Sequence, residues 1–196
     1  CLRDGIPDDW HAMHSKRVTL PSSGGESAFE GELDFLIIHP HKGVLALEVK
    51  GGREIGRDNR GWYSRSHTRG TGLFRIKDPG KQAQTVMHKL MAYVKNHTDK
   101  PDLKELGFGW GVAFPGFDID NQEGLGPELP PTLILDRKGL GNPEQVLQGM
   151  YKHWEKAQEQ PLSSEAHKEI IDLLMPVFEL TPSLTLAPQP IGKLGR

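Results

Sequence analysis

The chain has 196 residues, of which 36% are apolar, and it carries 24 Lys and Arg against 26 Asp and Glu. This length is close to the roughly 100–200 residues of one domain and suffices for one sizeable core, which argues against a disordered chain. A single Cys excludes a disulfide framework and a four-cysteine zinc site, and it favours a reducing, cytoplasmic location. The formal charge of −2 argues against a uniformly basic nucleic-acid-binding protein. No apolar run reaches the roughly 18 residues of a membrane span, so no membrane partner is expected.

The first half of the chain predicts three strands. Residues 10–20 alternate loosely between apolar and polar side chains, which indicates a strand. Residues 32–38 and 44–50 are apolar runs with charges at one end only, a pattern typical of central strands covered on both faces. The turn between them contains Gly43, which can adopt a positive φ.

The remainder of the chain predicts further strands and three helices. Residues 51–79 are rich in Gly and Arg and indicate a hairpin with strands at 61–64 and 73–77. Apolar residues at helical spacing after Pro79 predict an amphipathic helix over residues 81–95. We expect two more strands and two more helices, at residues 107–114, 131–135, 142–158 and 165–175.

Charged residues at the ends of the two central strands suggest a chemical site. Residues two apart in a strand share a face, so Glu32 pairs with Asp34, and Glu48 with Lys50. A hairpin loop of three or five residues makes opposed residue numbers sum to 82, which places Asp34 opposite Glu48 and Glu32 opposite Lys50. A four-residue loop would separate the two pairs unless a bulge restored the register.

Two carboxylates held across a strand pair repel each other unless a cation joins them. Mg²⁺ or Mn²⁺ suits Asp34 and Glu48, because hard divalent ions prefer oxygen ligands, and the carbonyl of Val49 adds another. Lys50 beside them is suited to positioning a water molecule or stabilising developing phosphorane charge. The alternative is an ordinary Glu–Lys pair at solvent-facing strand ends.

Four motifs in order carry a family resemblance. Residues 31–38 (GELDFLII), residues 43–51 (GVLALEVKG), Trp62 and residues 78–82 (DPGKQ) resemble the nuclease-related domain (NERD) family of the PD-(D/E)XK nuclease superfamily. The resemblance covers roughly residues 10–95. It implies a single α/β domain with a restriction-endonuclease-like core, in which α-helices flank a mixed β-sheet, and a metal-dependent nuclease site.

The resemblance assigns roles by position. Asp34 and Glu48 correspond to the metal ligands, Lys50 to the catalytic lysine and Gln82 to an auxiliary residue on the following helix; Glu32 is a further candidate because of the expected register. Superfamily members usually carry a helix before the first strand that contributes a Glu, whereas here only nine residues precede Trp10.

The expected domain spans residues 1–178, and residues 179–196 form a Pro-rich linker or tail. Such domains are often fused to superfamily I helicases resembling UvrD, and a linker into a C-terminal module would suit this tail. A chain that begins with Cys1 is accordingly expected to be part of a longer protein.

Positive charge is concentrated in residues 50–81, which carry nine Lys and Arg against three Asp and Glu, so the rest of the chain has a net charge of −8. A basic segment beside a metal pair is suited to a phosphate backbone of DNA, or of RNA as the alternative. Alternatively, it is a solvated loop, with Trp62 as a hydrophobic anchor. The candidate nucleic-acid-binding residues are Arg53, Arg57, Arg60, Trp62, Arg65, Arg69 and Lys81.

Three functions are compatible with these observations. The first is a Mg²⁺-dependent nuclease domain that acts on DNA, as part of a helicase-linked protein in DNA repair. The second is a non-cleaving nucleic-acid-binding or regulatory module of a helicase. The third is an interaction domain whose acidic C-terminal half docks a partner.

Overall fold

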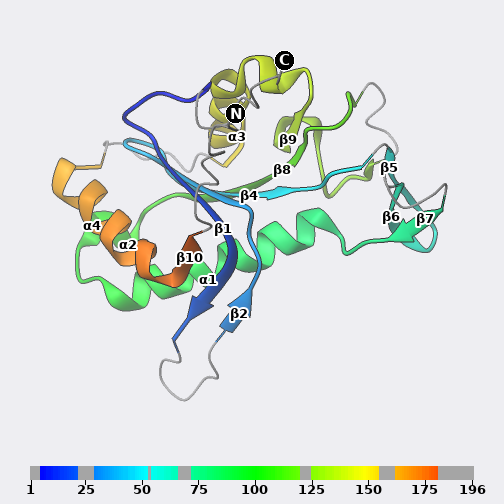
Figure 1. Cartoon of the computed structure of the whole chain (residues 1–196). Coiled ribbons are helices and arrows are strands. Elements are labelled where there is room, and N and C mark those ends of the chain that lie inside the picture. The colour runs from blue at the N-terminus through cyan, green and yellow to red at the C-terminus, as the bar shows by residue number, and fades with distance from the viewer. Residues whose placement is uncertain are drawn as a thin grey trace, which may run out of the picture.

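The computed structural model describes residues 5–21, 29–52, 54–65, 72–119, 125–154 and 162–180, with backbone only for residues 15, 16 and 178–180. A seven-stranded mixed sheet forms its centre, in the order β10-β1-β3-β4-β8-β9, and β2 pairs with β1 (Figure 1). The strands are β1 (His11–Leu20), β2 (Phe29–Gly31), β3 (Phe35–His39), β4 (Gly43–Val49), β8 (Phe108–Phe114), β9 (Ile134–Asp136) and β10 (Phe178–Leu180). Neighbours from β10 to β4 are antiparallel, whereas β4, β8 and β9 are parallel.

The hairpin of β3 and β4 has the register on which the sequence argument depends. Phe35 is opposite Leu47 and His39 is opposite Gly43, so opposed residue numbers sum to 82 and the loop has three residues. Gly43 has a φ of 105°, and a Cβ at this position would meet the carbonyl oxygen of Gly107. A side chain would therefore be strained there and would also collide with the neighbouring segment. The predicted turn and register are confirmed.

Helices cover both faces of the sheet (Figure 1). α1 packs against β4 and β8 on one face, with α2 and α4 beside it, and α3 packs on β8 and β9. Asp78 caps α1 by accepting a hydrogen bond from the backbone N–H of Lys81 at 3.0 Å, and Pro occupies the first turn, where no N–H is needed. The helices are α1 (Pro79–His97), α2 (Pro101–Lys104), α3 (Pro143–Trp154) and α4 (Ser164–Leu174), with 3₁₀ turns at Pro131–Leu133, Gly139–Gly141 and Met175–Val177.

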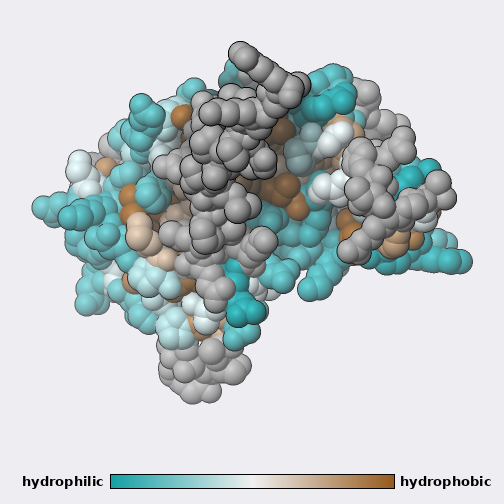
Figure 2. Space-filling view, in the orientation of Figure 1, coloured by the Kyte–Doolittle hydropathy of each residue, from teal (hydrophilic) through white to brown (hydrophobic). Residues whose placement is uncertain are grey.

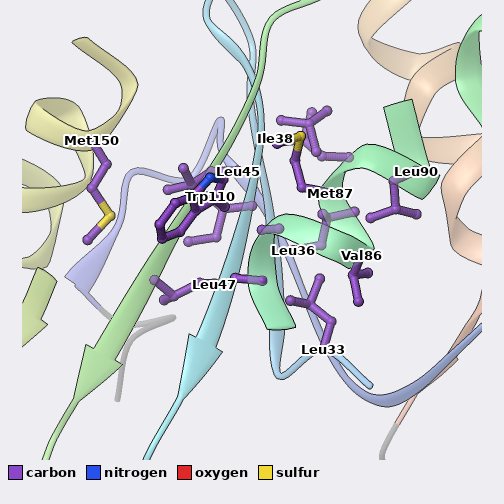
Figure 3. Close-up of a cluster of buried hydrophobic side chains, with 14 of the residues drawn as sticks. Leu33, Leu36, Ile38, Leu45, Leu47, Val86, Met87, Leu90, Trp110 and Met150 are labelled. Carbon is purple, nitrogen blue, oxygen red and sulfur yellow. The ribbon is translucent and has the colours of Figure 1, made fainter. Parts of the chain in front are cut away.

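The core lies between the sheet and these helices. Leu36 and Ile38 point toward Val86, Met87 and Leu90 of α1, and Met150 of α3 approaches from the opposite face (Figure 3). Small residues on β8 make the second contact possible, since a Cβ at Gly109 would collide with Trp154 and one at Gly111 with Met150. The continuous apolar runs of β3 and β4 are thus buried on both faces, as their sequence predicts.

A separate antiparallel sheet follows β4 and consists of β5 (Glu54–Asp58), β6 (Gly61–Arg65) and β7 (Leu73–Arg75). Trp62 attaches it to the main core, because its side chain is only 4% exposed. The sequence predicts a hairpin of two strands here, which correspond to β6 and β7, and β5 was not predicted. Gly56 and the charged residues of β5 weaken its strand signal, so pairing with β6 decides its conformation.

Other differences are small. The strand expected at residues 32–38 begins at Phe35, and β2, a three-residue strand paired with β1, was not expected. The helix expected to reach residue 158 is described as far as Trp154, and residues 155–160 lie outside those described. β10 includes Glu179 and Leu180, which the sequence analysis assigns to the tail; residues 181–196 lie outside those described. Among the described helices, none has the length and apolarity needed to cross a membrane.

Candidate functional site

Asp34 and Glu48 occupy the end of the β3–β4 ladder. Asp34 directly precedes Phe35, and Glu48 directly follows its partner Leu47, so continuation of this register places the two side chains on the same face. The chain bends at Asp34, and its Oδ2 accepts a hydrogen bond from the backbone N–H of Val49 at 2.7 Å. The backbone of β4 thereby holds in place the carboxylate that precedes β3.

Glu48 is a buried carboxylate with incomplete hydrogen bonding. Its residue is 3% exposed, Lys50 Nζ donates to Oε1 at 2.5 Å, and Oε2 has no hydrogen-bond partner among the described residues. Burial raises the pKa of Glu48 above its usual value; the hydrogen bond and charge of Lys50 oppose this rise, and the charges of Asp34 and Glu32 add to it. A bound cation would relieve this cost.

The same face of the sheet carries the start of α1. Trp110 points to this helix, since a Cβ at Gly80 would lie 3.3 Å from its ring. Glu48 is paired with Val112, two residues beyond Trp110, and therefore projects from the same face. Gln82 lies in the first turns of α1, and its Oε1 is buried without a partner among the described residues. The structure thus brings Gln82 to the side of the sheet on which Glu48 lies.

These oxygen atoms suit a hard divalent cation. The donor set comprises Glu48 with its unpartnered Oε2, Asp34 held by Val49 N–H, and the carbonyl of Val49 as the predicted third ligand. The described residues contain no group of three or more His, Cys, Asp and Glu side chains suited to a metal. The site therefore offers two carboxylates and leaves the remaining positions to backbone, water or substrate.

Glu32 does not occupy its expected place. The β3–β4 ladder ends at the Phe35–Leu47 pair, and the backbone N–H of Lys50 donates to Ala113 of β8 at 2.9 Å. Glu32 is exposed and lies on the wall of a groove instead, so the predicted pairing of Glu32 with Lys50 is wrong. The physical reason is that residues 32–34, with the bend at Asp34, interrupt the strand: β2 and β3 pair with β1 in one register, but only β3 continues to pair with β4.

The predicted phosphate-binding arginines of the small sheet are mostly paired with carboxylates. Arg57 donates to Glu128 at 2.7 Å, and Arg65 lies 3.4 Å from Glu54. The side chain of Arg60 makes no ion pair within the described residues, and its backbone N–H donates to Asp58. Arg53 and Arg69 lie outside the described residues.

The position of Trp62 does not suit the nucleic-acid-binding role predicted for it. Its side chain is 4% exposed and belongs to the core cluster, so its ring is not accessible to a nucleotide base. The alternative weighed from the sequence, that Trp62 anchors the β5–β7 excursion, agrees with this burial. The prediction that Trp62 binds nucleic acid is therefore corrected.

An open groove of about 640 Å³ lies between β2 and the start of α1. Hydrophilic residues border this part of the surface (Figure 2). Lys81 of the predicted set lies here, and Phe29, Lys77 and Arg17 are additions that the sequence analysis missed as site residues. Of these three residues, only Lys77 had a signal in the sequence, its place in the basic segment. Phe29 lies on β2, which was not predicted. The lining residues are Arg17, Phe29, Glu30, Gly31, Glu32, Lys77, Asp78, Lys81, Gln82, Thr85 and Val86.

Comparison with known proteins gives one family match. The family described as "Nuclease-related domain" matches residues 2–108, slightly more than half of the chain. This span includes β1 to β7, α1 and the residues Asp34, Glu48, Lys50 and Gln82. No curated protein and no solved structure matches the chain.

Proposed function

Because the chain belongs to the nuclease-related domain family, we propose that it is a divalent-metal-dependent nuclease domain that hydrolyses phosphodiester bonds of DNA. The observation that carries this proposal is the buried Glu48 carboxylate, whose Oε2 lacks a partner among the described residues beside Asp34 and Lys50. A protein seldom buries a carboxylate without full hydrogen bonding unless a ligand completes it. A carboxylate whose pKa is raised by burial beside other charged groups is typical of functional sites.

In this proposal, Asp34, Glu48 and the carbonyl of Val49 hold Mg²⁺ or Mn²⁺. When bound, such an ion polarises a phosphoryl oxygen and lowers the pKa of a water molecule. The hydrogen bond from Val49 N–H orients Asp34 before any ligand arrives. Preorganisation of this kind avoids a rearrangement during the reaction.

Lys50 and Gln82 would act on the reacting groups. Lys50 places its ammonium against Glu48, where it can stabilise negative charge that develops on the phosphate. Gln82 Oε1 needs a donor, and we propose that a water molecule supplies it and is thereby oriented toward the phosphorus. Water oxygen would form the new P–O bond while the bond to the leaving sugar oxygen breaks.

A nicking assay on supercoiled DNA tests the proposal. We expect cleavage that depends on Mg²⁺ or Mn²⁺, and we expect Asp34→Ala, Glu48→Gln and Lys50→Ala each to reduce its rate by about 100-fold or more, the scale of losing one catalytic group. Matched controls are Asp172→Asn and Lys152→Ala, which change exposed residues on α4 and α3. Cleavage that survives all three site substitutions would contradict the assignment.

A second readout reports metal binding without catalysis. Mg²⁺ should raise the thermal unfolding midpoint of the wild type, because a ligand that binds only the folded state stabilises it. Glu48→Gln should abolish this rise. In EDTA, Glu48→Gln should unfold at a higher temperature than the wild type, because it removes a buried charge whose pKa is raised.

The second candidate function is a module that binds nucleic acid without cutting it. It is favoured because the residues that the structure describes contain no group of three or more His, Cys, Asp and Glu side chains placed to hold a metal. A protein that binds DNA but cleaves none with Mg²⁺ or Mn²⁺ would support this function over the first. Association with a UvrD-like helicase module, and with DNA repair, is a further part of the proposal that rests on the family resemblance alone.

A further inference from the structure

The groove between β2 and α1 has two chemically different walls. Lys77 and Lys81 lie on the wall formed by the start of α1 and the segment before it. Phe29 lies on the opposite wall, which β2 forms, and Gln82 of the proposed catalytic set contributes to the lining. The groove therefore has a cationic wall and an aromatic wall, and it shares Gln82, but not Asp34, Glu48 or Lys50, with the proposed catalytic set.

Lys77 and Lys81 differ from the arginines of the small sheet. Within the described part of the chain, neither lysine side chain makes an ion pair, whereas Arg57, Arg65 and Arg75 each face a carboxylate. A cation that already has a carboxylate partner gains less from a phosphate, because the first partner must be displaced. The two lysines are thus the better phosphate ligands.

The ring of Phe29 is held in a fixed position on its wall. Phe29 is half-buried, and a Cβ at Gly31 would come within 2.6 Å of its ring, so the missing side chain of Gly31 lets the ring lie against the backbone. The Lys89 ammonium lies 6.0 Å from the ring centroid. An aromatic ring held in this way is a platform for a base, which would stack in the place that the Lys89 ammonium takes over the ring.

Carboxylates also line the groove and decide how a ligand would lie. Asp78 is engaged as the N-cap of α1, and Glu30 and Glu32 lie on the β2 side. Glu30 and Glu32 would repel phosphates from that side, where Arg17 of β1 is the one cation among the lining residues, and the two lysines would attract them to the α1 wall. The backbone of a bound strand would therefore follow the α1 wall, with a base directed toward Phe29.

We infer that this groove binds one unpaired strand of nucleic acid beside the scissile bond, with Lys77 and Lys81 on phosphates and Phe29 stacked on a base. A paired base has its faces covered by its neighbours in the duplex, so stacking on Phe29 requires an unpaired nucleotide. The volume of about 640 Å³ falls within the roughly 300–1,000 Å³ of sites that enclose small ligands, a size suited to nucleotides of a single strand. The inference rests on the proposed function for the position of the scissile bond, but not for binding itself.

Fluorescence anisotropy in EDTA tests the inference without cleavage. The probes are a labelled single-stranded DNA oligonucleotide, the same sequence as a duplex, and the corresponding RNA. We expect the single strand to bind at least tenfold more tightly than the duplex. The double variant Lys77→Ala/Lys81→Ala should lose about tenfold or more in affinity. The slope of its plot of log Kd against log salt concentration should be smaller by about 1.4, the value for two lost phosphate contacts on a single strand.

The aromatic wall is tested separately. Phe29→Leu should weaken single-strand binding about tenfold, the lower part of the range for one stacked base, without changing duplex binding. Phe29→Tyr, which keeps the aromatic face, should bind as the wild type does and guards against a loss caused by misfolding. Lys152→Ala on α3 is the matched control for a lost lysine.

Equal affinity for single strand and duplex, or single-strand binding unaffected by the lysine and Phe29 variants, would overturn the inference. Tighter binding of RNA than DNA would support the groove and contradict the DNA assignment of the proposed function. Groove binding as expected, without cleavage in Mg²⁺, would support this inference and reject the nuclease. If the groove variants cleaved both single strands and duplexes at the normal rate, this result would support the nuclease and reject this inference.

Discussion

At the end of β4, the carboxylate of Glu48 is buried with one oxygen unpartnered in the described structure, whereas on the β5–β7 sheet the carboxylates are exposed and paired with arginines. Burial raises the pKa of Glu48, while the hydrogen bonds from Arg75 lower the pKa of Asp58 to about 2. Both regions are rich in charge in the sequence. Only the first holds its charge in an environment that opposes ionisation.

This difference shows which charges are available for chemistry. Exposed ion pairs are screened by water and contribute little to stability, and their partners are already satisfied. A buried carboxylate with an oxygen that lacks a hydrogen-bond donor lowers the stability of the ligand-free protein. The same carboxylate is suited to binding a cation, so stability is lost where activity is gained. Within the basic segment of residues 50–81, the paired arginines of the β5–β7 sheet are therefore a poor guide to a binding surface, and Lys77 and Lys81 of the groove are a better one.

The largest expected effect concerns the attachment of the small sheet. Trp62→Ala should lower the free energy of unfolding by about 3–5 kcal/mol, because it removes a large buried side chain from the core. Trp62→Phe should cost clearly less. Urea denaturation followed by circular dichroism measures both changes. If Trp62→Ala left the stability unchanged and weakened DNA binding, Trp62 would stack on a base after all, and the two regions would not differ as described.

A smaller effect is a shift in pH dependence. Glu48 must be ionised to hold a cation, so the acid limb of the rate profile should lie above the ordinary glutamate pKa of 4.5. Lys50→Met should move this limb to higher pH, because Lys50 opposes the rise in the pKa of Glu48. The shift can be measured from the residual activity in Mn²⁺, or from metal binding titrated at a series of pH values. Asp58→Asn should leave the limb in place.

The sign for stability follows from the same shift. Between pH 4.5 and the raised pKa of Glu48, the folded state binds more protons than the unfolded state, so this residue's contribution to stability falls as pH rises through that interval. Glu48→Gln should remove this dependence. If the wild type and the variant had the same pH profile of stability in EDTA, burial would not raise the pKa of Glu48.

The smallest effect is expected at the surface pairs of the small sheet. Arg57→Ala and Arg75→Ala should leave the unfolding midpoint nearly unchanged, because Glu128 and Asp58 then return to water. They should also weaken single-strand binding less than loss of Lys77 and Lys81 does. Anisotropy with the same labelled oligonucleotide gives the comparison, and a larger loss in Arg57→Ala than in the lysine variant would reverse the ranking of the two surfaces.

The sequence by itself determined the central part of the fold and the position of the carboxylate pair. Apolar runs with charges at one end identify β3 and β4, and the short turn ending at Gly43 sets the register that places Asp34 on the face of Glu48. Pro79 and the helical spacing that follows identify α1, which carries Gln82. These features are local or depend on a hairpin, so the pattern of nearby residues is sufficient to predict them.

Only the tertiary structure decided which of the charged and aromatic residues near this pair are available to a ligand. Arg57 meets Glu128 across 71 positions of the chain, and Trp62 is buried by segments distant in sequence, so no local pattern could reveal either contact. β2 and β5 are short strands whose conformation depends on pairing with β1 and β6. The groove lies between β2 and the start of α1, so its lining depends on the long-range pairing of β2 with β1, which brings Phe29 and Glu32 together with Lys77 and Lys81 of the basic segment.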